Sequence, residues 1–185
     1  MTAAAHPLLS PLAQRFVLHW GEMGSRWGVN RSVAQIHALL YFHGRPLPAD
    51  DIADALQVAR SNVSNSLREL ISWNLVHVTH LMGDRRDHFE TSQEPWTLLR
   101  TIVRERRARE FEPTVAELRG CLADPDFARQ PAATQARLRE TLALMESLSA
   151  WSEEMLRLET PTLKKVLRLG ARIRRLLRDD RKPPA

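Results

Sequence analysis

The chain has 185 residues, with very little cysteine or glycine and no long uninterrupted apolar run. Cys121 is the single cysteine, so no disulfide can form within the chain, and a reducing compartment is favoured. Seven glycines are few for this length, which favours helix over sheet. No run approaches the roughly 18 apolar residues that a membrane span needs, and the first residues lack the pattern of a secretory signal. We therefore expect a mostly α, cytoplasmic protein with no membrane partner.

Signatures of enzymes and metal sites are also missing. The sequence contains no phosphate-binding glycine loop, no nucleophile elbow and no paired-histidine zinc motif. Asp50 and Asp51 are adjacent, and adjacent residues on a helix diverge by about 100°, so they do not share one site. His77, His80 and His88 lie close together in sequence, but His77 and His80 would face opposite sides of a regular strand. We predict no enzymatic activity, no cofactor and no metal.

Positive charge is concentrated near the C-terminus. The net charge is +5, yet the segment from Lys164 to Lys182 has nine basic and two acidic residues, a net of +7, which leaves −2 for the rest. This basic segment is either a solvated helix face or a surface that contacts nucleic-acid phosphate or an acidic partner. The sequence favours neither interpretation.

Apolar spacings of three and four predict four helices in the first part of the chain. They cover residues 8–27, residues from Asn30 to near Gly44, residues 49–56 and residues 60–73, and Pro46 to Pro48 form a short extended link. On the first helix, one face carries Leu12, Phe16, Trp20, Met23 and Trp27. The faces expected to be buried on the second and fourth helices are Val33, Ile36, Leu39, Leu40 and Phe42, and Val63, Leu67, Leu70 and Ile71.

A change of period after the fourth helix predicts a hairpin. Val76 and Val78 alternate with polar residues, as expected for a strand. A loop follows around Gly83 and Asp84, and residues 87–90 form the return strand. The order of short helix, second helix and hairpin is that of a winged helix-turn-helix.

Helical character resumes at Glu94 and continues nearly to the end. Pro95 suits a first helical turn, Pro113 is expected to kink or break the helix near Phe111, and Asp124-Pro125 is expected to end it. Further helices are predicted over residues 132–158 and 163–177. Mixed charges at helical spacing predict a solvated or interhelical ion-pair face, made of Arg104, Glu105, Arg106, Arg107, Arg109 and Glu110. We divide the chain into a winged helix-turn-helix domain, 1–92, and a helical region, 93–185, which is the candidate for dimerisation and for binding an effector.

The exposed side of the fourth helix carries short hydrogen-bonding groups and cations, and no acid before Glu69. Asparagine pairs with adenine, arginine with guanine, and serine with bases or phosphates. An ordinary polar face usually mixes acids with bases, so we favour DNA contact over a merely solvated face. The predicted DNA-binding residues on this helix are Arg60, Ser61, Asn62, Ser64, Asn65 and Arg68.

Two further arginines, Arg85 and Arg86, lie near the predicted hairpin tip. Gly83 permits a tight turn there, and paired arginines can reach a minor groove or flanking phosphates. A charged turn that only aids solubility is the alternative. The position of the two arginines shortly after the fourth helix favours DNA contact.

A family resemblance joins these features. The stretches DDIADALQVARSNVSNSLRELISWNLVHVTHLMGDRRDHFE and EPWTLLRTIVRERRAREFEPTVAELRGCL resemble the MarR-type winged helix, and specifically its GbsR-like branch. The resemblance implies a dimeric transcription regulator, often a repressor, that in some members responds to small molecules. Two positions depart from the usual helix-turn-helix pattern: Gln57 stands where many turns have glycine, and Ala59 where a capping serine is common.

The expected function is therefore sequence-specific binding of double-stranded DNA by a homodimer at pseudo-palindromic operators. The alternative is a winged helix that serves only as a protein-interaction module. An effector pocket walled by Trp20, Trp27 and Trp96 would suit a quaternary amine. Tryptophans that simply fill the core and the interface are the favoured interpretation of the same residues.

Overall fold

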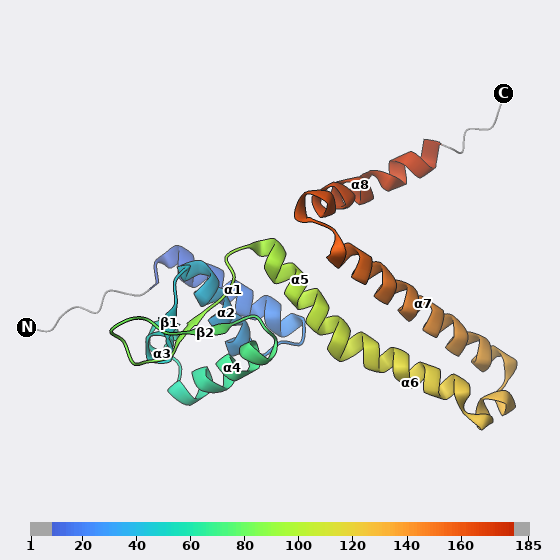
Figure 1. Ribbon diagram of the computed structural model, residues 1–185, viewed down its shortest axis with the longest axis horizontal. Coiled ribbons are helices and arrows are strands. Elements are labelled where there is room, and N and C mark those ends of the chain that lie inside the picture. The colour runs from blue at the N-terminus through green and yellow to red at the C-terminus, as the bar shows by residue number, and fades with distance from the viewer. Residues whose placement is uncertain (1–8, 180–185) are drawn as a thin grey trace, which may run out of the picture. The chain divides into compact units, whose positions relative to one another are not determined.

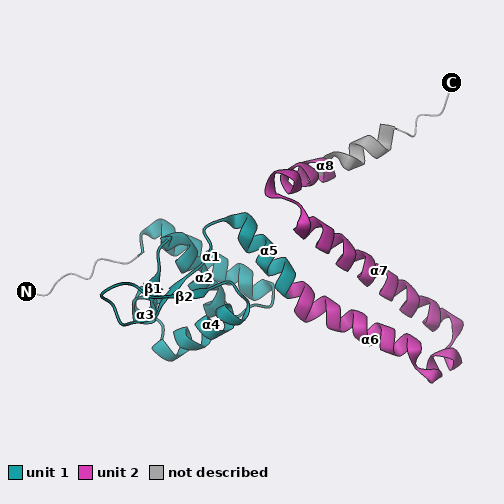
Figure 2. Cartoon of the chain, in the orientation of Figure 1, with its two compact units in different colours: residues 1–105 teal, residues 106–185 magenta. Residues whose placement is uncertain are grey.

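The computed structural model describes the backbone of residues 9–179 and the side chains of residues 9–170. The chain divides into two compact units, residues 1–105 and 106–185 (Figure 2). The boundary expected from the sequence, between residues 92 and 93, precedes helix α5 (Pro95–Arg106), whereas the division falls at the C-terminal end of that helix. Among the described residues, no helix is both long enough and apolar enough to cross a membrane.

Unit 1 is a winged helix, as expected. Figure 1 shows its helices grouped around a small sheet. In chain order its elements are α1 (Pro11–Arg26), α2 (Arg31–His43), β1 (Leu47–Pro48), α3 (Ala49–Leu56), α4 (Arg60–Ser72), β2 (His77–Thr79), β3 (His88–Glu90) and α5.

Helices α1 and α2 begin at residues that cap them. Ser10 accepts a hydrogen bond from the amide of Ala13, and Asn30 accepts one from the amide of Ser32 at 2.8 Å. Gly44 ends α2 in the left-handed conformation, with φ of 71°. The predicted limits of α2 are thereby confirmed.

The core of unit 1 lies between α2, α3 and α4. Its most deeply buried large side chains belong to these helices and to the segment before β2: Ile36, Leu39, Leu40, Ile52, Val63, Leu67 and Val76. Two residues predicted to be buried are exposed, Phe42 by 42% and Ile71 by 36%. Both lie near the C-terminal end of their helix, where fewer neighbouring elements cover the side chain.

Helix α1 packs through small residues rather than large ones. Its buried positions are Ala13, Val17 and Gly21, and a Cβ atom at Gly24 would lie 2.5 Å from the Cβ of Ala34 on α2. Small side chains on this face let the two helix backbones approach closely. Of the stripe of large residues predicted on α1, Phe16 packs against the core and Met23 is half-buried, whereas Leu12, Trp20 and Trp27 are exposed.

The sheet has three short strands in the order β1-β3-β2, all antiparallel. Strands β2 and β3 form the predicted hairpin, with Val78 opposite Phe89. The segment predicted as an extended link adds a third strand, since Leu47 pairs with Phe89. This strand joins the wing to the start of α3.

Unit 2 contains longer helices with little buried surface. It includes a π-helical turn (Arg107–Phe111), α6 (Glu112–Ala123), a 3₁₀ turn (Pro125–Arg129), α7 (Ala132–Arg157) and α8 (Thr160–Asp179). Helices α6 and α7 run side by side in opposite directions (Figure 1). Among the described residues of this unit, Val115 and Leu163 are the only buried apolar side chains.

The expected disturbance at Pro113 takes the form of a π turn. Proline has no N–H to donate, and its ring clashes with the carbonyl four residues earlier. Just before it, the amide of Glu112 donates to the carbonyl of Arg107, five residues back. The wider turn accommodates the proline without ending the helix, and the chain continues directly into α6.

The predicted ion-pair face is confirmed in part, at Arg106, Arg107 and Glu110. Arg106 pairs with Glu110 at 3.0 Å within its helix turn. Arg107 pairs with Glu112 at 3.2 Å and reaches Glu153 on α7 at 3.4 Å. Arg107 thus links this turn to α7 within the unit.

Candidate nucleic-acid interface

Helix α4 begins without a side-chain cap. Ala59 occupies the N-cap position with φ of −62° and ψ of 140°, and no side chain accepts a hydrogen bond from the first turn. Ser61 therefore does not replace the missing cap. Unpaired amide groups and the positive end of the helix dipole remain at this end, where an anion is favoured.

The turn before α4 is equally unusual. Gln57 ends α3 in the left-handed region, with φ of 54°. Its side-chain amide donates to the carbonyl of Asp54 at 2.6 Å. A non-glycine residue in this conformation costs about 1 kcal/mol or more, but the turn keeps helix-turn-helix geometry.

Five of the six predicted residues on α4 are exposed, and Ser64 is half-buried. They lie opposite Val63, Leu67 and Leu70, which face the core. We call these six residues, Arg60, Ser61, Asn62, Ser64, Asn65 and Arg68, the α4 face. The structure thus presents this face outward on a helix that is braced from behind.

Two residues of the α4 face are tied to other helices. Arg60 donates from Nε to Asp50 Oδ1 of α3 at 2.6 Å, and from Nη1 to Ser64 Oγ. Asn62 donates from its amide to Ser32 Oγ of α2 at 3.1 Å. These two side chains therefore have structural partners as well as an outward position.

The remaining polar groups of the α4 face are held locally or not at all. Arg68 donates to the Asn65 side-chain oxygen within the helix. Ser61 makes no side-chain hydrogen bond with any described residue. Asn65 keeps its amide N–H groups available, because its oxygen is the atom that Arg68 binds.

The hairpin, residues 77–90, forms the wing, and its loop positions Arg86 tightly. Arg86 donates from Nε to Asp84 Oδ1 at 3.0 Å and from Nη2 to Oδ2 at 2.6 Å, a two-pronged pair. These hydrogen bonds lower the pKa of Asp84 well below its usual range and raise the pKa of Arg86. Both groups are therefore charged throughout the neutral range, and Arg86 also reaches Asp51 of α3 at 3.4 Å.

Arg85 differs from its neighbour. It is exposed, and it has no hydrogen bond or ion pair with any described residue. In the sequence the two arginines are equivalent neighbours. In the structure Asp84 neutralises Arg86, whereas the full charge of Arg85 is available to a ligand.

Two of the three histidines of the hairpin have partners, and these partners differ. His88 is buried and donates from Nδ1 to the carbonyl of Arg86 at 2.9 Å, and its Nε2 lies 3.4 Å from Asp84 Oδ2. His80 lies 3.2 Å from Asp87, and His77 is exposed. In the described part of the chain, no three His, Cys, Asp or Glu residues are grouped to hold a metal ion.

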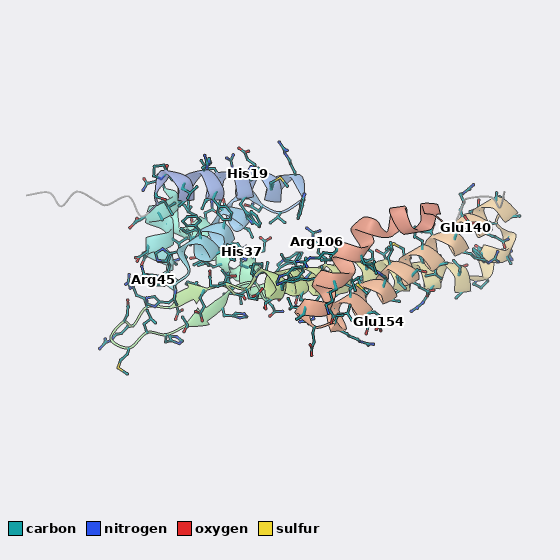
Figure 3. The ribbon with its side chains drawn as sticks, turned by 90° about the horizontal axis from the view of Figure 1, so that it is seen from above. His19, His37, Arg45, Arg106, Glu140 and Glu154 are labelled. Carbon is teal, nitrogen blue, oxygen red and sulfur yellow. The ribbon has the colours of Figure 1, made fainter. Side chains whose placement is uncertain are left out.

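A buried polar chain, not anticipated from the sequence, links α2 to the wing. The Thr91 hydroxyl donates to the carbonyl of Leu75 at 2.7 Å, so its oxygen accepts from His37 Nε2 at 3.2 Å. Burial lowers the pKa of His37 (labelled in Figure 3) to about 4. His37 is therefore neutral at pH 7, and it ties the base of the wing to the core.

The tryptophans expected to wall an effector pocket lie on α1 and at its end, and on α5. Trp20 is 45% exposed and stacks on Phe16 at 5.4 Å, Trp27 is 68% exposed, and Trp96 is half-buried. The buried core of the described residues contains no tryptophan. The interpretation that tryptophans fill the core is therefore wrong, and the interpretation that they fill an interface stays a prediction.

The basic C-terminal segment is described only in part. Lys164, Lys165 and Arg168 on α8 are exposed. The side chains from Arg172 onward lie outside the described residues.

Part of the winged helix matches a known protein family. The model of the MarR family matches residues 27–87. This segment runs from the end of α1 through α2, α3 and α4 into the wing, so it contains both the α4 face and the two wing arginines. No curated protein matches the chain.

The chain is similar to several solved structures. The crystal structure of a transcriptional regulator matches with a TM-score of 0.62 at 20% identity, covering 79% of this chain and 96% of that one. A complex of Staphylococcus aureus MepR with DNA matches at 0.37 with 19% identity, covering 74% and 91%. NadR with 4-hydroxyphenylacetate matches at 0.36 with 20% identity, covering 86% and 99%. The family match and the first of these structures together establish a MarR-type winged-helix fold.

Sequence reasoning missed the acids of this surface. In the sequence, Asp50 and Asp51 stand out only as an adjacent acidic pair, and Asp84 only as a turn residue. Each contacts an arginine of the candidate interface. Their position in the first turn of α3 and in the wing loop is visible in the sequence, but the arginine that each contacts depends on the tertiary fold.

Proposed function

We propose that this chain is a sequence-specific DNA-binding transcription regulator, rather than an enzyme. In this proposal α4 enters the major groove, and the wing contacts the adjacent minor groove or its phosphates. The observation that carries the proposal is the α4 face, an outward helix surface without an acid, on a segment that matches the MarR family model.

The α4 face has the chemistry of base readout. Ser61 and the amide N–H groups of Asn65 can reach base edges, and Arg60 and Arg68 can pair with guanine or phosphate. The uncapped start of α4 adds amide groups that favour a phosphate. In the wing, Arg85 supplies a charge that no described residue neutralises.

We propose that the protein acts as a homodimer at pseudo-palindromic sites. One winged helix makes too few contacts for specific affinity. On α7, Leu144, Leu148 and Trp151 recur at spacings of four and three and are all exposed. A second copy covering this stripe supplies the apolar burial that unit 2 lacks.

Finer aspects of the function rest on the family resemblance or on the sequence alone. They are action as a repressor, membership of the GbsR-like branch, a cytoplasmic location and a response to a small molecule at Trp20, Trp27 and Trp96. The effector prediction is tested by titrating tryptophan fluorescence with betaine and choline. No change at millimolar concentrations would refute the aromatic cage.

The central test is selection of a binding site from random duplexes, followed by fluorescence anisotropy on the selected duplex and on a scrambled one. We expect a pseudo-palindrome with half-sites about one helical turn apart, and binding that weakens as salt rises. If no sequence is enriched and no salt-sensitive binding occurs, the DNA proposal fails and a protein-interaction module becomes the better interpretation.

Substitutions then separate the reading of the DNA sequence, proposed for Asn65, from general affinity for DNA, proposed for Arg85. Asn65→Ala should reduce the preference for the selected duplex about tenfold. Arg85→Ala should weaken both duplexes alike and lower the salt slope by about 1. Arg129→Ala, an exposed arginine of unit 2, removes the same charge elsewhere and should change neither quantity. Equal behaviour of all three variants would show that the residue roles are misassigned.

A further inference from the structure

The first turn of α3 places two carboxylates beside the candidate interface. Asp50 Oδ1 lies 2.6 Å from Arg60 Nε on α4, and Asp51 Oδ1 lies 3.4 Å from Arg86 Nη1 in the wing. Figure 1 shows the wing loop passing beside α3. Acids at a surface that binds phosphate cost affinity through repulsion, so their presence needs a physical explanation.

The divergence of adjacent helix residues explains how two neighbours reach two elements. Side chains of consecutive residues point about 100° apart. One carboxylate is therefore directed to α4 and the other to the wing, and α3 makes a charged contact with both DNA-facing elements. Both pairs are solvent-accessible, with side chains between 40% and 62% exposed, so DNA can compete for the arginines.

The arrangement also sets the charge of the surface. The four arginines proposed to contact DNA are Arg60, Arg68, Arg85 and Arg86, and two of them, Arg60 and Arg86, are paired with the three carboxylates of Asp50, Asp51 and Asp84. Non-specific affinity for DNA comes almost entirely from cations that neutralise phosphates. Arginines that are paired with carboxylates attract arbitrary duplexes less strongly than free ones.

The two acids also orient the arginines that they contact. The Asp50 carboxylate and the Ser64 hydroxyl hold the Arg60 guanidinium at two of its nitrogens. A side chain that is already oriented loses less conformational entropy when it binds. Asp51 adds a hydrogen bond to Arg86 from outside the wing, which fixes the arginine relative to α3.

We propose that Asp50 and Asp51 determine the specificity of DNA recognition by holding Arg60 and Arg86 in position and by opposing attachment to arbitrary phosphate. This inference rests on the proposed DNA-binding function. It assigns the two acids as positioning residues, which act through the arginines and do not read bases themselves.

The test compares Asp50→Asn and Asp51→Asn with the wild type on the selected duplex and on the scrambled duplex, over a salt series. For each variant we expect affinity for the scrambled duplex to rise about fivefold, because one repulsive charge is lost. The ratio of selected to scrambled affinity should fall about tenfold. Asp50→Glu keeps the charge and the acceptor, and should restore most of the ratio.

Asp54→Asn is the matched control. Asp54 lies on the same helix, is exposed, and has no arginine partner among the described residues. Its replacement removes the same charge and should leave the ratio within about twofold of the wild type. Thermal unfolding of each variant checks the fold, and a loss of folded protein would reduce binding to both duplexes without altering their ratio.

The outcomes are distinct. An unchanged ratio in Asp50→Asn and Asp51→Asn, with a wild type that prefers the selected duplex, overturns the inference and leaves the proposed function intact. An equal fall in the ratio of selected to scrambled affinity for Asp54→Asn also overturns the inference, because the effect would then be one of net charge alone. A wild type that binds no duplex refutes the proposed function and this inference together.

Discussion

Unit 1 and unit 2 bury apolar surface in very different ways. The core of unit 1 includes Ile36, Leu39, Ile52 and Val63, all less than 2% exposed. The longer helices of unit 2 leave Leu144 59% exposed and Trp151 60% exposed. Since apolar burial is the main favourable term in folding, unit 1 has the interior of a self-sufficient domain. Unit 2 leaves apolar surface exposed that we propose a second copy covers.

The largest expected effect tests the stripe on α7. Leu144→Glu combined with Leu148→Glu places two charges where the second copy should pack, and we expect the dimer to dissociate. Sedimentation velocity measures the change in mass, and affinity for the selected pseudo-palindrome should fall on the order of 100-fold. Ala143→Glu with Ala150→Glu adds the same charges at exposed α7 positions off the stripe and should leave the dimer intact. A wild type that sediments as a monomer would refute the assignment.

A core substitution gives the contrasting result in unit 1. Leu39→Ala removes a side chain that is 1% exposed, and it should cost about 2–5 kcal/mol of unfolding free energy. Urea unfolding measures this loss, which should not depend on protein concentration. Leu144→Ala is the comparison, and its cost should shrink on dilution as the dimer dissociates. Equal concentration dependence for both variants would remove the distinction between the two units.

The next effect concerns the buried His37 and its dependence on pH. The pKa of His37 falls from 6.5 to about 4 on folding because burial disfavours the charged ring. Between these values the unfolded chain binds a proton that the folded chain does not, so stability present above pH 6.5 is lost as the pH falls toward about 4. The total loss has an upper limit of about 3 kcal/mol.

The measurement is urea unfolding of the wild type and His37→Gln at several pH values from about 7.5 to about 4.5, a range that spans most of the shift. Glutamine keeps an N–H for Thr91 but does not titrate. The wild type should therefore lose stability faster than the variant as the medium is acidified. Parallel profiles would show that His37 does not contribute to the acid sensitivity of unit 1.

The smallest expected effect lies at the start of α4. Ala59 already has a backbone conformation that suits an N-cap, so Ala59→Ser should stabilise unit 1 by about 1 kcal/mol. Thermal unfolding measures the gain, and Ala59→Val, which cannot accept a hydrogen bond, is the control. A serine variant no more stable than the valine variant would show that the first turn of α4 is satisfied by water.

Local signals predicted much of unit 1. The N-cap of Asn30 and the helical end at Gly44 depend on neighbouring residues alone, and both were confirmed. The strand at Leu47 escaped prediction because two residues carry no period, and its pairing partner, Phe89, is distant in sequence. The exposure of Phe42 was missed for a related reason: the helical spacing places it near a core face without showing which element covers that end.

The candidate site also has one part that local signals predict and another that depends on contacts between distant residues. The acid-free face of α4 and the arginines of the wing follow from residue types and spacing, because a helix of period 3.6 that buries Val63 and Leu67 must turn its polar residues outward. The sequence by itself determined that a cationic and amide-bearing surface exists. Only the tertiary structure decided that Arg86 and Arg60 are held by acids while Arg85 has none among the described residues, since these partners come from separate elements that folding brings within hydrogen-bond distance.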